Sequence, residues 1–146
     1  MADSRQAFNT TLDNAVRLHV SGEIDHAIGL YHSLLDEHPD HPDLWHLLGV
    51  AVHQRGDNRL AVQLITMALT IKNDVADYHN NLGIALRGLG QEESAERSFR
   101  SAIRLNPQHA RALSNLASAC RNAGDIASGL DYARQAATIA GSDPEA

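Results

Sequence analysis

The sequence is poor in cysteine, in aromatic side chains and in long apolar runs, and each shortage excludes a class of protein. Its one cysteine, Cys120, excludes an internal disulfide and a multi-cysteine metal site. Aromatic residues make up 4% of the chain and hydrophobic residues 43%, a balance that suits close helix packing better than a β-sheet. No apolar run reaches about 18 residues, and no apolar signal-peptide segment follows Met1. We therefore expect a soluble cytoplasmic protein, or a fragment of one, without membrane contact.

Basic residues are also in short supply. The chain has 12 Lys and Arg against 18 Asp and Glu, so its net charge is −6 with the histidines neutral. This charge opposes general attraction to the phosphates of nucleic acids. Arg97, Arg100 and Arg104 follow a run of glutamates at helical spacing, which predicts a solvated face with salt bridges rather than a phosphate-binding surface. We expect no nucleic-acid partner.

Nine histidines are present, but their spacing does not predict a metal site. His46 and His53 would lie two turns apart on one helix, about 10 Å along its axis, which is too far for one ion. The chain also lacks a His-Glu-x-x-His motif, an evident nucleophile and base pair and a phosphate-binding glycine loop. We expect no metal, no cofactor and no catalysis. Protonating all nine histidines would move the net charge from −6 to +3, so we expect binding to change between about pH 5.5 and 7.5.

One pattern recurs every 34 residues along nearly the whole chain, in copies that begin at Phe8, Pro42, Ala76 and Ala110. The eighth and twentieth positions of each copy hold only Ala or Gly. The fifteenth position is always glycine: Gly22, Gly56, Gly90 and Gly124. Glycine suits the residue after a helix because it enters the left-handed conformation without steric cost. A fixed period of this length indicates an array of helical hairpins.

The copies predict an all-α fold of eight helices joined by short turns. We expect them at residues 4–20, 23–37, 43–55, 58–72, 76–89, 92–105, 110–123 and 126–140. Asp57 and Asp125 suit helix N-caps, and Pro42 suits a first helical position. The small residues at the eighth and twentieth positions should let the two helices of a hairpin approach closely, and Cys120 should be a buried apolar residue. We expect one domain over residues 1–146, with repeats at about 8–41, 42–75, 76–109 and 110–143.

Trp45-x-x-Leu48-Gly49, followed in the next copy by Ala95, Phe99 and Pro107, resembles the pattern of the tetratricopeptide repeat (TPR) family. The resemblance covers about residues 8 to 143. It implies a right-handed superhelical solenoid of four helix-turn-helix hairpins. It also implies a protein-protein interaction module, which binds an extended segment or a helix of a partner protein in its concave groove.

The family places the groove-lining positions on the first helix of each copy. The candidates for specificity there are His46, His53, Asn80, Asn81, Arg87, Asn115, Arg121 and Asn122. Asn81-Leu82-Gly83 and Asn115-Leu116-Ala117 resemble the asparagine ladder of O-linked N-acetylglucosamine transferases and their bacterial relatives. A side-chain amide both donates and accepts, so two such rungs could pair with the backbone of any extended peptide. The alternative is that both asparagines are merely solvated helix residues.

Two other functions stay open at this point. One is the substrate-recruiting TPR region of a larger protein glycosyltransferase, and the other is a scaffold that self-associates. No polar capping helix ends the array, so its last helix, which carries Leu130 and Ile139, is the end expected to meet a further copy. A clamp for the carboxylate of a chaperone tail is excluded, because it needs basic and amide residues where Leu12 and Val16 stand.

Overall fold

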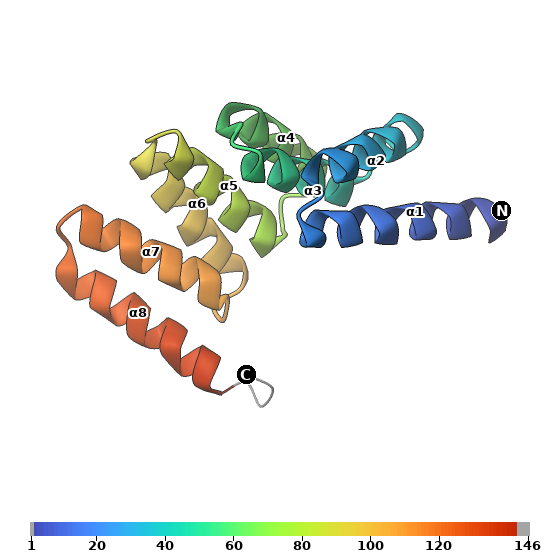
Figure 1. Ribbon diagram of the computed structural model, residues 1–146. Coiled ribbons are helices and arrows are strands. Elements are labelled where there is room, and N and C mark those ends of the chain that lie inside the picture. Colours follow the sequence, from blue (N-terminus) through green and yellow to red (C-terminus); the bar gives the residue numbers. More distant parts are fainter. Residues whose placement is uncertain (1, 143–146) are drawn as a thin grey trace. The chain divides into compact units, whose positions relative to one another are not determined.

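The computed structural model describes residues 2–142 and confirms the all-α class (Figure 1). Eight helices fill this part of the chain, and it contains no strand. Their bounds are α1 Ala2–Ser21, α2 Ile24–Glu37, α3 Pro42–Gln54, α4 Asn58–Ile71, α5 Ala76–Gly88, α6 Glu92–Leu105, α7 Ala110–Asn122 and α8 Ile126–Gly141. Consecutive helices pair as four hairpins, α1 with α2, α3 with α4, α5 with α6 and α7 with α8.

The chain divides between Asn73 and Asp74 into two compact units. The first unit contains α1 to α4 and the second contains α5 to α8, and each is described below by itself. The assignment of residues 1–146 to a single domain stays a prediction. No helix within residues 2–142 has both the length and the apolar character needed to cross a bilayer.

Each hairpin turns at the periodic glycine. Gly22, Gly56, Gly90 and Gly124 have φ values of 90°, 99°, 73° and 87°, which is the left-handed region that the sequence predicts. After each of them, the next backbone N–H donates to the carbonyl five residues back, as in Asp57 to Val52 at 3.1 Å. Asp57 and Asp125 then cap the following helices by accepting from Leu60 and Ser128. Both expected caps are confirmed.

Small residues bring the two helices of a hairpin close together. A Cβ on Gly49 would lie 3.3 Å from the carbonyl oxygen of Ala61, and a Cβ on Gly129 would lie 3.0 Å from that of Ala117. These pairs join the eighth and twentieth positions of one repeat, so the expected close approach is confirmed there. Cys120 is 3% exposed, and burial raises the pKa of its thiol. It is the buried apolar residue that the sequence predicts.

A histidine is buried in the first hairpin. His19 of α1 is 9% exposed, and its Nδ1 lies 3.1 Å from the hydroxyl of Tyr31 in α2. Burial lowers the pKa of His19, and a hydrogen bond with Gln54 opposes this shift only in part. Burial also raises the pKa of Tyr31 to about 12. Both shifts favour the uncharged forms, so at neutral pH the pair is uncharged in the folded first unit.

This burial predicts that acid destabilises the first unit. The pKa of His19 in the folded state lies below its ordinary value of 6.5, so between these two values the unfolded chain binds a proton that the folded chain does not. The free energy of unfolding therefore falls as the pH drops below about 6.5 and levels off below the folded pKa. Urea unfolding measured from about pH 8 to pH 5 should show this slope in the wild type and a shallower slope in His19→Gln. Parallel pH profiles for the two proteins would refute the assignment.

Candidate functional site

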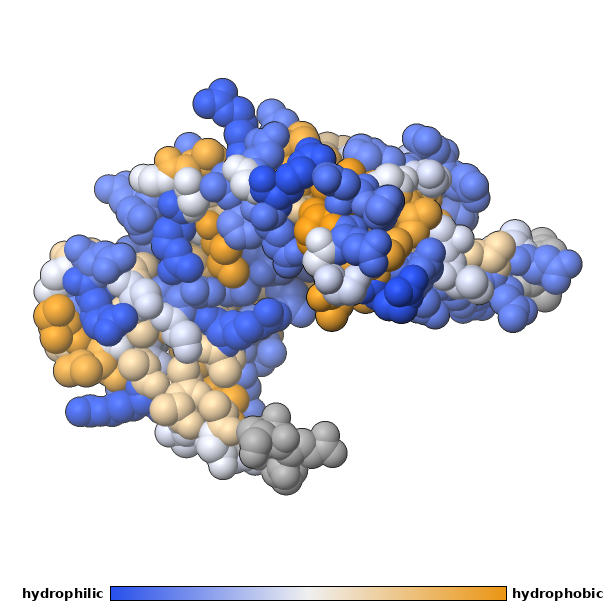
Figure 2. Space-filling model, viewed as in Figure 1, coloured by the Kyte–Doolittle hydropathy of each residue, from blue (hydrophilic) through white to orange (hydrophobic). Residues whose placement is uncertain are grey.

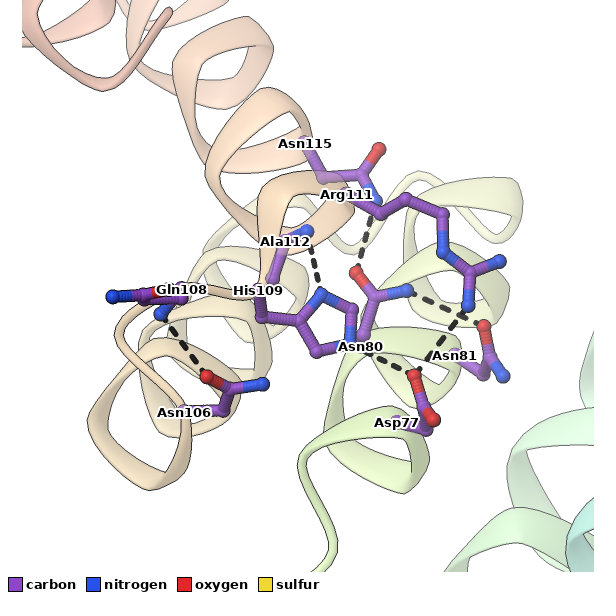
Figure 3. A network of polar contacts seen from close by, with 9 residues as sticks. All are labelled: Asp77, Asn80, Asn81, Asn106, Gln108, His109, Arg111, Ala112 and Asn115. Carbon is purple, nitrogen blue, oxygen red and sulfur yellow. Dashed lines mark hydrogen bonds and ion pairs between the residues drawn. The ribbon is translucent and has the colours of Figure 1, made fainter. Parts of the chain in front are cut away.

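The candidate site of the second unit lies where α5 and α7 pack side by side. Both are first helices of their hairpins, so the 34-residue period places equivalent positions on them. We name the polar surface that they share the α5/α7 face. It consists of Asp77, Asn81, Arg87, Arg111, Ser114 and Asn115 (Figure 3 shows all but Arg87 and Ser114).

A chain of hydrogen bonds crosses this face. Arg87 donates to the Oδ1 of Asn115 at 3.1 Å, and the Nδ2 of Asn115 donates to the Oδ1 of Asn80 at 3.0 Å. The Nδ2 of Asn80 donates in turn to the Oδ1 of Asn81 at 3.4 Å (Figure 3). A guanidinium can only donate, so Arg87 fixes the orientation of Asn115, and each amide then fixes the next. The donor-to-acceptor direction of all three hydrogen bonds, from Arg87 to Asn81, therefore follows from the guanidinium of Arg87.

Arg87 is itself held in place. Its guanidinium carbon lies 5.5 Å from the centre of the Phe99 ring of α6, within the range of a cation–π contact. Phe99 is completely buried, whereas Arg87 is half-buried. The aromatic core of the third hairpin therefore positions the donor that orients Asn115.

Asp77, His109 and Arg111 form a second cluster on the same side of α7. The Nε2 of His109 lies 2.8 Å from the Oδ1 of Asp77, which also accepts from Arg111 at 3.4 Å. The backbone N–H of Ala112 donates to the Nδ1 of His109 at 3.2 Å and so caps α7. Because that N–H can only donate, Nδ1 is the accepting nitrogen of the ring, and Nε2 is the nitrogen that faces the carboxylate of Asp77. The two bonds fix both sides of the ring.

Sequence reasoning missed His109 and its contact with Asp77. His109 stands immediately before α7, where a side-chain acceptor satisfies one of the unpaired N–H groups of a helix start. The position of His109 in the sequence therefore predicts a cap. The bond to Asp77 was not readable, because the two residues lie 32 positions apart and meet only through the packing of α5 against α7.

The eight predicted site residues fall into separate groups. Asn80, Asn81, Arg87 and Asn115 come together in the network described above. Arg121 and Asn122 are exposed at the end of α7. His46 and His53 belong to α3 of the first unit, where His53 is half-buried and its Nδ1 lies 2.6 Å from Asn58 Oδ1.

The structure differs from expectation at Asn80. A ligand contact was expected, but Asn80 is 0% exposed and both ends of its amide bond to other asparagines. Its role is to support Asn81 and Asn115, which are half-buried. Ser114 stands at the same repeat position as Asn80 and is exposed. Repeat register alone therefore does not decide which side chain is accessible.

The first unit has an open cleft between its own first helices, α1 and α3. Its volume is about 450 Å³, and its lining is Leu12, Asp13, Val16, Arg17, Asp43, His46 and Leu47. We name it the α1/α3 cleft. Among residues 2–142, no group of three His, Cys, Asp or Glu side chains could hold a metal ion.

Four helical hairpins with polar surfaces on their first helices define a helical-repeat protein. The chain belongs to the tetratricopeptide repeat family, whose model matches residues 12–76 and 80–144. Proteins of this fold serve as protein-interaction modules. A comparison with curated proteins finds no match.

Several solved structures share the fold. A crystal structure of MamA is 17% identical and has a TM-score of 0.83, with 95% of this chain and 81% of that one covered. MamA from Desulfovibrio magneticus is 16% identical with a TM-score of 0.82, covering 94% of this chain and 77% of that one. An O-GlcNAc transferase from Thermobaculum terrenum is 28% identical with a TM-score of 0.82, covering 90% of this chain and 26% of the transferase. The resemblance to transferase repeats thus has a structural counterpart.

Proposed function

We propose that the α5/α7 face binds an extended segment of a partner protein and that Asn81 and Asn115 pair with its backbone. The observation that carries this proposal is the oriented amide chain. Asn115 uses one N–H and one oxygen lone pair within the protein, and a side-chain amide has two of each. One donor and one acceptor remain, and an extended backbone offers the matching acceptor and donor.

The network prepares Asn115 for this contact. An amide that must be ordered on binding loses conformational freedom, which weakens affinity. Here Arg87 and Asn80 already hold the amide in one orientation, so little freedom remains to be lost. Because these contacts read the backbone rather than side chains, they fit partners with different sequences. The chain itself acts by binding, and no catalytic step is assigned to it.

Capture of partners on immobilised protein tests the proposal. We expect wild type to retain a protein from the lysate of the source organism that an Asn81→Ala/Asn115→Ala variant loses. The comparison variant is Asn80→Ala, which breaks the bonds to Asn81 and Asn115 but keeps the bond between Arg87 and Asn115, at a residue that is 0% exposed and so cannot touch a ligand. Both variants lose the support that Asn80 gives to the face, so a greater loss of partner in the asparagine double variant reports contact by Asn81 and Asn115.

A second control lies on α6. Arg97 and Arg104 are exposed and donate only locally, to Ser94 and Ser101. An Arg97→Ala/Arg104→Ala variant should capture the partner as wild type does. Equal capture by wild type and by the asparagine double variant would contradict the proposal. Circular dichroism should show equal helicity in all the variants.

A second candidate function is substrate recruitment within a larger protein glycosyltransferase. The transferase from Thermobaculum terrenum favours it, because 28% identity over 90% of this chain exceeds that to the MamA structures above. The amide chain would then read acceptor proteins for glycosylation. Reading the gene past the codon for Ala146 decides between the two, since only this candidate requires a transferase domain in the same protein.

Self-association is the remaining proposal for a partner. On α8, Ile126 is 54% exposed and Leu130 is 49% exposed. Exposed aliphatic side chains on one helix support contact with a further copy. Molecular mass that rises with protein concentration would support it, and a constant monomer mass would refute it. Figure 2 shows apolar colours in separate patches on an otherwise polar visible face.

A further inference from the structure

The α1/α3 cleft has aliphatic walls that reach the surface. Leu12 and Val16 come from α1 and Leu47 comes from α3. Val16 is 36% exposed, and Leu12 and Leu47 are half-buried. Covering these side chains with apolar groups of a ligand would remove them from water, which stabilises binding by about 25 cal/mol for each Å² of apolar surface buried.

The ionisable side chains that line the cleft are two carboxylates, one guanidinium and the imidazole of His46. Asp13 of α1 and Asp43 of α3 both line it and are exposed. Arg17 lines it as well, but its guanidinium donates to the Oδ1 of Asn14 at 2.7 Å. The first unit as a whole is also negatively charged. Residues 1–73 contain nine Asp or Glu and five Lys or Arg, a net charge of −4 with the histidines neutral.

We propose that the α1/α3 cleft binds a segment of a partner protein in which a Lys or Arg stands beside an aliphatic residue. The aliphatic side chain and the methylene stem of the cation would cover Leu12, Val16 and Leu47. The cationic head would reach the carboxylates of Asp13 and Asp43, where hydrogen bonds between charged groups are stronger than neutral ones. An acidic segment would instead meet like charge. This inference rests on the proposed function, because it assigns a class of peptide to a second surface of the same interaction module.

Two synthetic peptides test the proposal on the full chain. Both have an Ala and Gly host sequence, one with Leu-Lys-Leu-Lys at its centre and the other with Leu-Glu-Leu-Glu. We expect the lysine peptide to shift the backbone amide NMR signals of α1 and α3 residues around the cleft. We expect the glutamate peptide to leave them in place. Added salt should weaken binding of the lysine peptide, because exposed ion pairs are screened.

A charge variant and its matched control locate the site. Asp13→Asn/Asp43→Asn should weaken binding of the lysine peptide by about fivefold to tenfold, which corresponds to about 1 to 1.4 kcal/mol. Asp36→Asn/Glu37→Gln makes the same change of net charge at two exposed residues of α2 outside the cleft. It should bind as wild type does. Its amide spectrum and that of the cleft variant also report whether each protein is folded.

Several results would overturn the proposal. One is that neither peptide shifts any amide signal, and another is that the glutamate peptide binds as tightly as the lysine peptide. The others are shifts confined to helices other than α1 and α3, and unchanged affinity for the lysine peptide in Asp13→Asn/Asp43→Asn. Partner loss in the Asn81→Ala/Asn115→Ala variant combined with any of these results would leave the proposed function standing without the cleft. Peptide binding at the cleft, together with unchanged partner capture by the Asn81→Ala/Asn115→Ala variant, would support the cleft and contradict the proposed role of the α5/α7 face.

Discussion

Replacing Phe99 by alanine is expected to lower the free energy of unfolding of the second unit by about 3 to 5 kcal/mol, the usual result of removing a buried aromatic ring. Phe99 is 0% exposed and is one of the largest completely buried side chains in the described chain. Its ring lies against Gly83 of α5 and beneath Arg87. Alanine would leave a cavity at the centre of the third hairpin and would free the guanidinium that orients Asn115. Urea unfolding followed by circular dichroism measures the loss.

Phe8→Ala is the matched control for this deletion. Phe8 is only half-buried, and its ring packs nearly perpendicular to the His38 ring with a centroid distance of 4.7 Å. The same atoms are removed from a site that water already reaches, so the loss should be less than half of that at Phe99. A loss below about 1 kcal/mol for Phe99→Ala would contradict the packing described here.

Gly83→Ala is expected to destabilise the second unit, although alanine is the better helix former. A Cβ at Gly83 would lie 2.5 Å from the Cε1 of Phe99 and 2.7 Å from its Cδ1. The ring is completely buried and cannot move away into solvent, and overpacking of this kind costs about 1 to 3 kcal/mol. Most of this range exceeds the gain in helix propensity of about 1 kcal/mol. We expect a net loss of up to about 2 kcal/mol in urea unfolding.

Gly29 provides the opposite case for the same substitution. It lies within α2, and nothing stands within 4 Å of a Cβ built on it. Gly29→Ala should therefore stabilise the protein by up to about 1 kcal/mol. Stabilisation by both alanine variants would mean that the helices of the third hairpin do not pack as closely as described.

Features that depend on a residue's own backbone could be read from the sequence. The glycine at the fifteenth position of every repeat predicted a left-handed turn, and all four glycines have positive φ. Asp57 and Asp125 could be read as caps because capping joins residues three positions apart. The burial of Cys120 followed from its repeat position, where the other copies carry leucine or valine.

Features that depend on a neighbouring repeat could not be read in this way. Asn80 and Asn81 are adjacent and both polar, and their sequence does not say which one α7 covers. The result depends on Asn115, 35 positions from Asn80, whose amide bonds to it. The contacts within the α1/α3 cleft could not be read either. The TPR resemblance places Leu12, Val16 and Leu47 on the groove side of their helices, but their meeting required the packing of two repeats.

Site-specific photo-crosslinking tests the central claim, that the α5/α7 face is the contact surface for a partner protein, most directly. A photoreactive amino acid would replace Ser114, which is exposed on α7 beside Asn115, and in a second protein Arg97, which is exposed on α6. We predict that the probe at position 114 crosslinks to a protein in the source lysate and that the probe at position 97 does not. Crosslinks from position 97 alone, or equal crosslinks from both positions, would contradict the claim.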